Sequence, residues 1–339
     1  MHPILAGALI PPPWRPLRWD LRDEFTLAEC AAIVQRADYT VSSNQYSHTG
    51  GAELPLVIRI APMHEILRNL PPGARVLDLG SGAGSFRAEH CPHAIIIRLD
   101  PERSPGVPHS GFVQADAAHM PFRDGSFDAV IANHSLEHME ELGGALSETG
   151  RVVRRGASLY VAVPDASTFS DKLYRWIYHG GGHINPFDSP SELSRRIAQR
   201  TGLQPVAIRV LYASFIYLHH SHFHPRPPRR LWLFGNGNAR FIAFLSYALR
   251  GLDRLVGTRA SVYGWGLYFG APPPEIDMRG WPNVCVHCGA GHSAAWLKLQ
   301  HAVRRRILWV RAFDCPNCGG WNLFTDDVAE VRTRYTMLQ

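Results

Sequence analysis

Short apolar runs alternate with longer mixed stretches through the middle of the chain. Runs of three to six mostly apolar residues are typical of strands buried in a parallel sheet, and the stretches between them are long enough for crossover helices. The alternation therefore predicts an α/β core with helices on both faces of the sheet. The expected strands lie at residues 74–79, 94–99, 112–114, 129–132 and 158–163.

The pattern continues towards the C-terminus with a capped helix, two more strands and an insertion. Residues 189–192 read Ser-Pro-Ser-Glu, which combines a capping serine, a proline at the first helical position and a glutamate at the third. A helix is therefore expected from here to Thr201. Strand-like runs follow at residues 203–211 and 261–269. The connection between these strands is too long for a structureless loop, so residues 214–260 should contain structure of their own.

This insertion predicts one amphipathic helix and concentrates positive charge. It holds seven arginines against one acidic residue, Asp253. Such a helix either packs its apolar face on its own domain, which is the commoner arrangement, or binds anionic headgroups at a membrane surface. The apolar positions at helical spacing are Phe241, Phe244, Leu245, Ala248, Leu252, Leu255 and Val256.

Length and composition are those of an ordinary globular protein. The 339 residues suggest two domains, and 45% of them are hydrophobic and 19% charged. The formal net charge of +6 permits anionic partners such as nucleic acid, phospholipid headgroups or phosphorylated substrates without selecting among them. No apolar run reaches 18 residues, residues 1–14 lack a basic leader and cysteines are few. We therefore expect a cytoplasmic protein without a membrane span.

A glycine-rich turn follows the first expected strand. Residues 76–84 read VLDLGSGAG, in which three glycines let the backbone turn sharply and approach a ligand at a helix N-terminus. The G-x-G-x-G spacing after Asp78 differs from the G-x-G-x-x-G of dinucleotide sites, where the helix end faces a pyrophosphate, and it favours an adenosyl ligand without phosphate. A plain tight turn would also use such glycines. Asp100 and Asp116, which end the next two strands, favour the ligand, because an acidic side chain at the position of Asp100 can accept hydrogen bonds from both ribose hydroxyls.

Four segments, taken in order, resemble the methyltransferase superfamily with the seven-stranded Rossmann-like sheet. They read VLDLGSGAGSF, IIIRLD, QADAAHMPFRDGSFDAVIANHSLEHM and RVVRRGASLYVAVPD, and the resemblance covers roughly residues 50–212. The chain is similar in particular to the type-11 and type-23 methyltransferase domains, whose D-x-x-x-L-P-F-x-x-x-x-F-D stretch occurs here with Met120 for leucine. The chain departs from this pattern at one point: Arg155-Gly156-Ala157 stands where these domains usually have a Gly-Gly turn before the fifth strand.

The resemblance implies that S-adenosylmethionine is the cofactor and indicates which residues contact it. It implies that the glycine turn faces the methionine part, that Asp78 contacts the ammonium group and that Asp100 holds the ribose. It also implies that Asp116 accepts from the adenine amino group and that Asn133 offers its backbone. The implied cofactor-binding residues are Asp78, Gly80, Ser81, Gly82, Gly84, Asp100, Asp116, Ala117 and Asn133.

Two histidines are candidates for catalysis. Methyl transfer from a sulfonium mainly requires that nucleophile and methyl group be held in line, although a hydroxyl acceptor would benefit from a general base, for which histidine is suited. His134 lies just past the fourth strand, next to where the methyl group should project. His183 follows a glycine run and resembles the G-H-x-x-x-F-[ST]-x-x-E-L stretch that borders the substrate cleft of these enzymes. His138 is expected instead to pack or to bond to backbone.

Two C-x-x-C-G motifs near the C-terminal end predict a zinc ribbon. Four thiolates suit tetrahedral zinc, and the glycine relieves the tight turn of each motif. Redox C-x-x-C motifs occur singly in a thioredoxin-like context. A site filled by four sulfurs is closed to water and substrate, so the zinc should be structural. The expected ligands are Cys285, Cys288, Cys315 and Cys318, with His287, His292 and His301 not needed.

These features predict three parts of the chain. The first is an N-terminal helical or irregular extension, residues 1–50, which precedes a methyltransferase domain, residues 51–273, with the basic insertion inside it. The zinc-ribbon module follows at residues 274–339, and its boundary is set by the proline-rich linker near residue 274.

The preferred function is S-adenosylmethionine-dependent O-methylation of a small-molecule or glycan acceptor. The basic insertion would either cover the cleft or make a peripheral contact with a membrane surface. The alternative is an RNA methyltransferase whose ribbon and Arg304–Arg306 face hold phosphates. Against this alternative, residues 133–136 read Asn-His-Ser-Leu and not the N/D-P-P-Y of many nucleic-acid methyltransferases. A scaffold without turnover is a third reading, which the intact aspartates Asp78, Asp100 and Asp116 disfavour.

Overall fold

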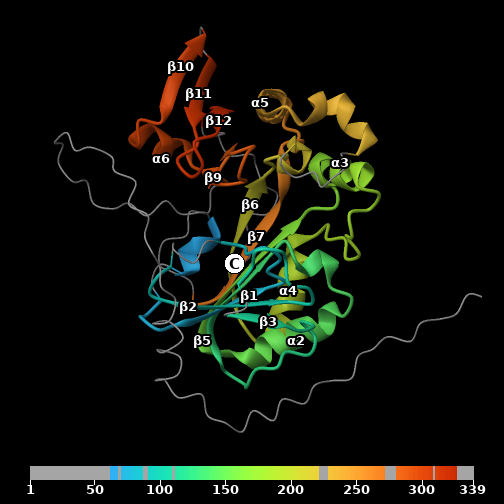
Figure 1. The fold of residues 1–339 in the computed structure, drawn as a ribbon, viewed down its shortest axis with the longest axis vertical. Coiled ribbons are helices and arrows are strands. Elements are labelled where there is room, and N and C mark those ends of the chain that lie inside the picture. The colour runs from blue at the N-terminus through green and yellow to red at the C-terminus, as the bar shows by residue number, and fades with distance from the viewer. Residues whose placement is uncertain are drawn as a thin grey trace, which may run out of the picture. The chain divides into compact units, whose positions relative to one another are not determined.

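A seven-stranded mixed sheet forms the centre of the computed structural model, which describes residues 62–67, 70–86, 91–108, 111–220, 228–271, 280–307 and 310–326 (Figure 1). The strand order is β3-β2-β1-β4-β5-β7-β6, and β7 alone runs antiparallel to its neighbours. Every apolar run named above forms a strand, so the predicted Rossmann-like sheet is confirmed. The strands are β1 Arg75–Leu79, β2 Ile95–Asp100, β3 Phe112–Gln114, β4 Phe127–Asn133, β5 Val153–Pro164, β6 Pro205–Tyr212 and β7 Val262–Gly270.

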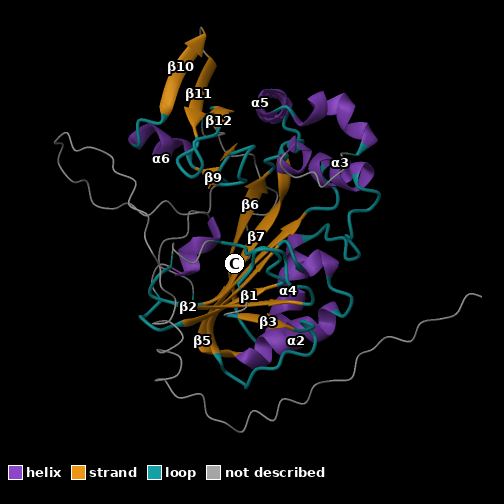
Figure 2. Cartoon of the chain, in the orientation of Figure 1, coloured by secondary structure: helices purple, strands orange, loops and turns teal. Residues whose placement is uncertain are grey.

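Helical segments cover both faces of the sheet (Figure 2). One face packs against α2 (Leu142–Val152) and α4 (Pro190–Thr201), and the opposite face packs against the 3-10 helix η1 (Pro62–Leu67). The predicted caps of α4 are present, because the Ser189 side chain accepts from the Glu192 amide and Gly202 is left-handed with φ 73°. The expected N-terminal extension and the boundary near residue 274 lie outside the described residues.

The fifth strand begins earlier than the sequence indicates. Arg155-Gly156-Ala157 was expected to form the turn that precedes it, yet these residues lie inside β5. Gly156 has φ +80°, and the register between β4 and β5 shifts between Phe127 and Ala129. Val153 pairs with Phe127 and the next pair is Ser158 with Ala129, so residues 154–157 leave the ladder around Gly156 and regular pairing begins at Ser158, as expected.

The insertion between β6 and β7 contains two 3-10 segments, η4 (Ile216–Leu218) and η6 (Arg229–Gly237), and the expected helix, α5 (Ala239–Val256). One face of α5 packs on its own domain, with Ile242 and Ala243 in a core cluster and Leu249 against it, while much of the expected apolar stripe stays exposed. Phe244, Leu255 and Val256 are 62%, 86% and 67% exposed. The residues that α5 buries are Ile242, Ala243, Ser246, Arg250 and Asp253.

Polar bonds contribute to this orientation of α5. The buried Arg250 guanidinium donates to the Val284 carbonyl oxygen at 3.4 Å. Asp253 accepts from the Ser261 amide at 2.8 Å and from the Ala260 amide at 2.7 Å, which fixes the entry into β7. These bonds act together with the packing of Ile242 and Ala243 in holding this face of the helix against the protein.

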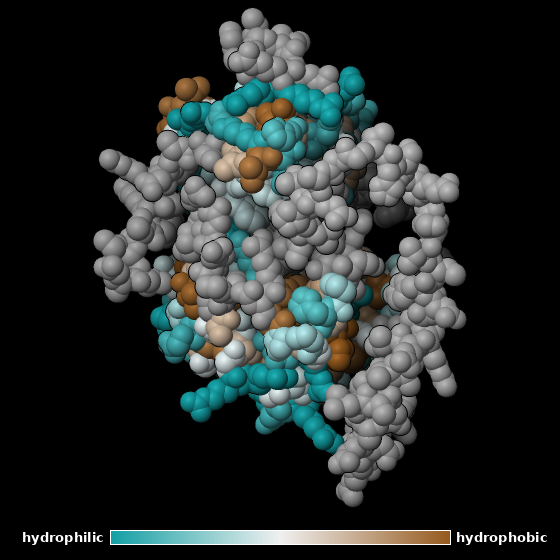
Figure 3. Space-filling model, turned by 90° about the vertical axis from the view of Figure 1, so that its left-hand side faces the viewer, coloured by the Kyte–Doolittle hydropathy of each residue, from teal (hydrophilic) through white to brown (hydrophobic). Residues whose placement is uncertain are grey.

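A small module with its own core follows the sheet. Its β8 (Asn283–Val284) pairs with β9 (Gly291–His292), and α6 (Ala294–Leu299) leads to a three-stranded antiparallel sheet. That sheet comprises β10 (Val303–Ile307), β11 (Val310–Asp314) and β12 (Trp321–Leu323). Cys285, Leu297, Phe313 and Phe324 are among its core residues. Hydrophilic residues make up most of the described surface in the upper part of Figure 3. Among the described helices, none is both long and apolar enough to cross a membrane.

Candidate active site and metal centre

The glycine turn after β1 wraps the end of β2 and leaves open space on its outer side. The amides of Gly80 and Ser81 donate to the Leu99 carbonyl oxygen at 2.8 and 3.1 Å. A Cβ on Gly80 would lie 2.4 Å from the Cβ of Ser135, so only glycine fits there. A Cβ on Gly82 would meet nothing within 4 Å. The turn thus provides a backbone cradle of the kind a cofactor occupies.

Asp100 is brought to this turn as the sequence predicts. Its Oδ2 accepts from the Gly82 amide at 2.8 Å, and its Oδ1 accepts from the Glu102 amide at 3.1 Å. Asp116 follows on the neighbouring strand end, where its carboxylate is 65% exposed and accepts from the Ala118 amide at 2.9 Å. Ala117 beside it is buried. The two carboxylates therefore lie at adjoining strand ends, as ribose and adenine recognition would require.

Asp78 is fully buried beneath the same turn. Its Oδ2 accepts from the Ser85 amide at 2.9 Å and lies 3.8 Å from Arg98 Nε, whereas Oδ1 has no hydrogen-bond partner among the described residues. Burial raises the pKa of Asp78 to about 6, against the lowering effects of Ser85 and Arg98. Gly84 closes the turn by donating to the Ser81 carbonyl oxygen at 2.6 Å. An unpartnered carboxylate oxygen at this place fits the ammonium group of a methionine-containing cofactor.

A cavity of about 340 Å³ opens at the C-terminal end of β4. Asn133 and His134 line it. The next residue, Ser135, packs against Gly80 and so connects the cavity wall to the glycine turn. Its wall combines tyrosines from α3 (Phe169–Ile177), from the insertion and from β7 with residues of the C-terminal module. Those last residues are Trp281, Val284, Gly289 and Gly291. The cavity lies where an acceptor would meet a methyl group carried by the glycine turn.

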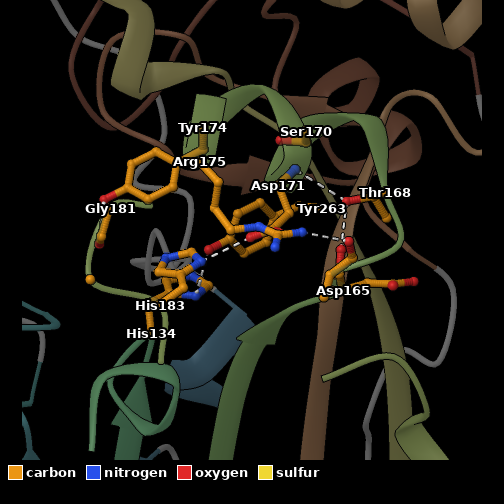
Figure 4. A network of polar contacts seen from close by, with 12 residues as sticks. His134, Asp165, Thr168, Ser170, Asp171, Tyr174, Arg175, Gly181, His183 and Tyr263 are labelled. Atoms are coloured by element: carbon orange, nitrogen blue, oxygen red, sulfur yellow. Dashed lines mark hydrogen bonds and ion pairs between the residues drawn. The ribbon is translucent and has the colours of Figure 1, made fainter. Parts of the chain in front are cut away.

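His134 enters this cavity in a strained backbone conformation. Its φ of +55° is left-handed, which is uncommon for a residue with a side chain. Its Nδ1 lies 3.3 Å from Tyr263 Oη, and the two rings meet edge to face at 4.9 Å (Figure 4). The residue is exposed, and its ring lines the cavity. Desolvation by the surrounding protein, with the nearby His183 and His138, lowers the pKa of His134 to about 4, so the imidazole is neutral at pH 7.

His183 is held by an acidic partner that the sequence analysis did not name. Its Nδ1 lies 2.9 Å from Asp171 Oδ1, and Asp171 also pairs with Arg175 Nε at 2.6 Å (Figure 4). The Tyr174 ring stacks on the imidazole at 4.8 Å. Asp171 sits in the first turn of α3, whose N-cap is Thr168. A threonine followed three residues later by an acidic residue is a helix-start signal that could have located this helix.

His138 bonds to backbone as expected, because its Nδ1 lies 2.9 Å from the Gly182 carbonyl oxygen. The neighbouring Glu137, which the sequence analysis passed over, is 1% exposed and lines the cavity. Burial raises the pKa of Glu137 to about 8, and the charge of Asp171 adds to this effect. The cavity thus gathers three histidines and two buried carboxyl groups, those of Glu137 and Asp171.

The four cysteines of the C-terminal module converge as a zinc ribbon requires. The Sγ atoms of Cys285 and Cys318 are 3.7 Å apart, and those of Cys288 and Cys315 are 3.8 Å apart. Tetrahedral zinc with bonds of about 2.3 Å places its sulfurs at about this separation. His292 is not needed as a ligand, and its Nε2 lies 3.3 Å from Cys315 Sγ. The donor set and spacing therefore fit a structural zinc ion.

Comparison with known proteins agrees with this geometry. Residues 77–161 match the family described as "Methyltransferase domain". The chain is 32% identical over 130 residues to malonyl-[acyl-carrier protein] O-methyltransferase of Methylococcus capsulatus, which covers 34% of this chain and 47% of that protein. It is 37% identical over 99 residues to demethylmenaquinone methyltransferase of Beutenbergia cavernae, which covers 27% and 41%. In both alignments the chain spans less than half of the relative's own length.

A further similarity extends beyond the central strands. The malonyl-[acyl-carrier protein] O-methyltransferase of Halorhodospira halophila is 26% identical over 280 residues, which cover 74% of this chain and 93% of that protein. The strand order with an antiparallel β7 and the matched residues 77–161 define the class of the central part. The sheet has the class I, Rossmann-like topology, and residues 77–161 within it match the methyltransferase domain family.

Proposed function

We propose that the protein transfers a methyl group from S-adenosylmethionine to an oxygen of a small-molecule or glycan acceptor. The observation that carries the proposal is the juxtaposition of the open glycine turn with the cavity, since Ser135 touches Gly80 and follows directly after Asn133 and His134. Donor and acceptor held on the two sides of one strand end would meet in line, which is the main requirement of methyl transfer.

The cofactor roles follow from the residues of the turn. Asp78 would pair with the methionine ammonium, Asp100 would accept from the ribose hydroxyls and Asp116 would accept from the adenine amino group. Gly80, Ser81, Gly82 and Gly84 would provide the close backbone surface, and Ala117 and Asn133 would flank the adenine and the sulfonium. S-adenosylmethionine supplies an activated methyl group when bound, so these residues need only bind and orient it.

The cavity suits an acceptor of modest size with polar groups. Its volume of about 340 Å³ lies at the lower end of ligand pockets, which suits a small molecule or the terminal unit of a larger one. Ser214, Phe215 and Tyr217 line it, which supports a role of the basic insertion in acceptor recognition. The names of two relatives, malonyl-[acyl-carrier protein] O-methyltransferases, favour oxygen as the methylated atom. His134, neutral at pH 7, would accept the acceptor's proton.

We further propose that α5 rests on an anionic membrane surface. Phe244, Leu255 and Val256 are exposed on this helix. Arg240 and Arg254 belong to the same helix, and its single acidic residue, Asp253, is buried. Exposed apolar residues among arginines are the features of helices that lie in the interface of anionic lipids. This would suit an acceptor attached to a lipid.

The RNA alternative has less support from the described residues. The ring of Trp296, which could offer a stacking surface to an RNA base, stacks on His292 with ring centroids 5.3 Å apart. Arg304 lies 3.5 Å from Asp314, so its charge is partly balanced. Trp309 and the side chains of Arg305 and Arg306 lie outside the described residues. A small-molecule or glycan acceptor therefore remains the proposal.

Calorimetry with S-adenosylhomocysteine tests the donor half of the proposal. Asp100→Ala should weaken binding by roughly tenfold or more, because each lost hydrogen bond is worth about 1 kcal/mol. The exposed Asp188→Ala is the control and should bind like the unmodified protein. Absence of binding by the unmodified protein would overturn the proposal.

Methyl-labelled cofactor and a cell extract test the acceptor half. Mass spectrometry of the labelled species should find the label in low-mass or glycan compounds. Label recovered in RNA would overturn the acceptor class and favour the alternative.

A further inference from the structure

Three side chains that ligate metals converge on the wall of the cavity. Glu137 and His138 belong to the short 3-10 helix η3 (Leu136–His138), and His183 lies in the loop after α3. One ligand atom from each of the three lies within 4.8 Å of the other two. Two imidazoles and one carboxylate form a donor set that suits divalent transition metals and leaves coordination positions open for substrate.

Both histidines have an oxygen partner on Nδ1. Nδ1 of His183 lies 2.9 Å from Asp171 Oδ1, and Nδ1 of His138 lies 2.9 Å from the Gly182 carbonyl oxygen. Because an oxygen acceptor keeps the proton on Nδ1, Nε2 of each ring is left with its lone pair. Metal-bound histidines commonly have such a partner on the other nitrogen, which fixes the tautomer and the ring orientation.

Glu137 supplies an independent observation. Its side chain is 1% exposed, and neither carboxylate oxygen has a hydrogen-bond partner from another described residue. The amides of Ile184 and Asn185 both donate to the Glu137 carbonyl oxygen, at 2.9 and 3.0 Å, so the loop that carries His183 is tied to η3. A buried carboxylate without a donor is costly, and a cation facing it would remove that cost.

We propose that Glu137, His138 and His183 bind one divalent transition-metal ion at the wall of the acceptor cavity, separate from the ion of the four cysteines. The inference rests on the proposed methyltransferase function and narrows the acceptor to compounds that offer an oxygen ligand, such as a hydroxyl beside a carbonyl or carboxylate. The ion would hold that oxygen and lower the pKa of the hydroxyl. The oxygen then attacks the methyl carbon, the carbon–sulfur bond breaks with its electron pair moving to sulfur, and the proton passes to His134.

Titration of the full chain with Co²⁺ tests the site, because the visible spectrum separates it from the cysteines. Co²⁺ bound by imidazole and carboxylate lacks the intense thiolate charge-transfer band that a cysteine site gives. We expect about one Co²⁺ per chain without that band. Glu137→Gln and His183→Gln should weaken this binding at least tenfold. The control Glu140→Gln, three residues further on and exposed, should bind Co²⁺ like the unmodified protein.

The affinity of each variant for S-adenosylhomocysteine reports folding and separates the two proposals. A variant that retains this affinity but loses Co²⁺ supports the metal site. Equal Co²⁺ affinity of Glu137→Gln and Glu140→Gln, or Co²⁺ bound only with a thiolate spectrum, would overturn it while leaving methyl transfer intact. Co²⁺ binding without any affinity for S-adenosylhomocysteine would instead overturn the proposed function. Anomalous scattering from Co²⁺-soaked crystals of the unmodified protein locates the ion without any variant, and an ion found elsewhere would overturn the assignment.

Discussion

Gly80 and Gly82 lie two residues apart in the same turn but are required for different reasons. Both have positive φ, 65° and 50°. A Cβ on Gly80 meets Ser135 at 2.4 Å, whereas a Cβ on Gly82 meets only open space. The first glycine is therefore required by packing. The second glycine keeps open the space over the turn that a cofactor would fill.

This difference predicts unequal effects on stability and on cofactor affinity for two alanine substitutions. Gly80→Ala should lower the free energy of unfolding by about 2–4 kcal/mol, since it adds overpacking to left-handed strain. Gly82→Ala should lower the free energy of unfolding by only about 1–2 kcal/mol, the cost of left-handed strain. It should nevertheless reduce cofactor affinity, because the added methyl group enters the open space where the cofactor would lie. Urea unfolding and calorimetry measure the two quantities. Equal stability losses in both variants would contradict the packing argument.

Asp78 makes stability depend on pH in a predictable direction. Its pKa is raised from 3.8 to about 6 in the folded chain. The folded state therefore binds an extra proton between pH 4 and 6, and stability falls as the pH rises through this window. The shift corresponds to about 3 kcal/mol, at about 1.4 kcal/mol per unit.

Asp78→Asn should remove this dependence. The variant without cofactor should be more stable than the unmodified protein above pH 6 and nearly equal to it at pH 4, and it should bind S-adenosylhomocysteine poorly. Urea unfolding across this range gives the difference between the two proteins. A difference that does not change with pH would show that Asp78 is already charged and paired.

The residues that sequence analysis missed are those whose partners are distant in the chain. Arg209 of β6 pairs with Glu65 of η1 through two contacts of 2.9 and 2.8 Å, and both side chains are buried. No local pattern links residues 144 positions apart. Asp78 and Asp100 could be predicted as cofactor-binding residues because a local motif carries them, whereas Glu137 gave no such signal. A buried glutamate is recognised only once its surroundings are known.

At the scale of elements, hydrophobic pattern located the strands but not the buried face of α5. A strand such as β1 is buried on both faces, so its apolar run is sufficient evidence. The helix α5 had two candidate faces, and the one fixed by Arg250 and Asp253 is buried. The more apolar stripe remains exposed. Its exposure is the reason to test membrane binding.

Leu255→Glu should weaken sedimentation with anionic phospholipid vesicles at least several-fold, because a charge would enter the apolar part of the interface. Leu299→Glu is a matched control, since Leu299 is 74% exposed on α6 against 86% for Leu255. Raised salt should weaken binding of both proteins through the arginines. Equal loss in the two variants, or equal binding to neutral vesicles, would contradict the membrane proposal.

At the scale of the whole molecule, the C-terminal module closes the cavity that the sheet opens. Trp281, Val284, Gly289 and Gly291 line its wall, and Val286 packs in one cluster with Ile242 of α5. Gly289 belongs to the first C-x-x-C-G motif itself. The sequence predicted the zinc ribbon and the methyltransferase sheet separately. It held no information on their contact, which arises from packing between residues far apart in the chain.

If the four cysteines bind zinc as predicted, this contact gives that zinc a consequence for catalysis. Replacing Cys285 and Cys315 by Ser removes two of four sulfur ligands, so the zinc should be lost and the module should loosen. Asp78 lies on β1, the glycine turn follows that strand, and Asp100 ends β2. Among the described residues, no hydrogen bond joins this site to the four cysteines. Affinity for S-adenosylhomocysteine should therefore stay within about twofold of the unmodified protein, whereas turnover should fall at least tenfold because one wall of the cavity is displaced. Elemental analysis, calorimetry and methyl transfer assays measure the three quantities.

If zinc is lost while turnover persists, the module does not shape the acceptor cavity. If cofactor affinity falls as much as turnover, the module supports the whole fold.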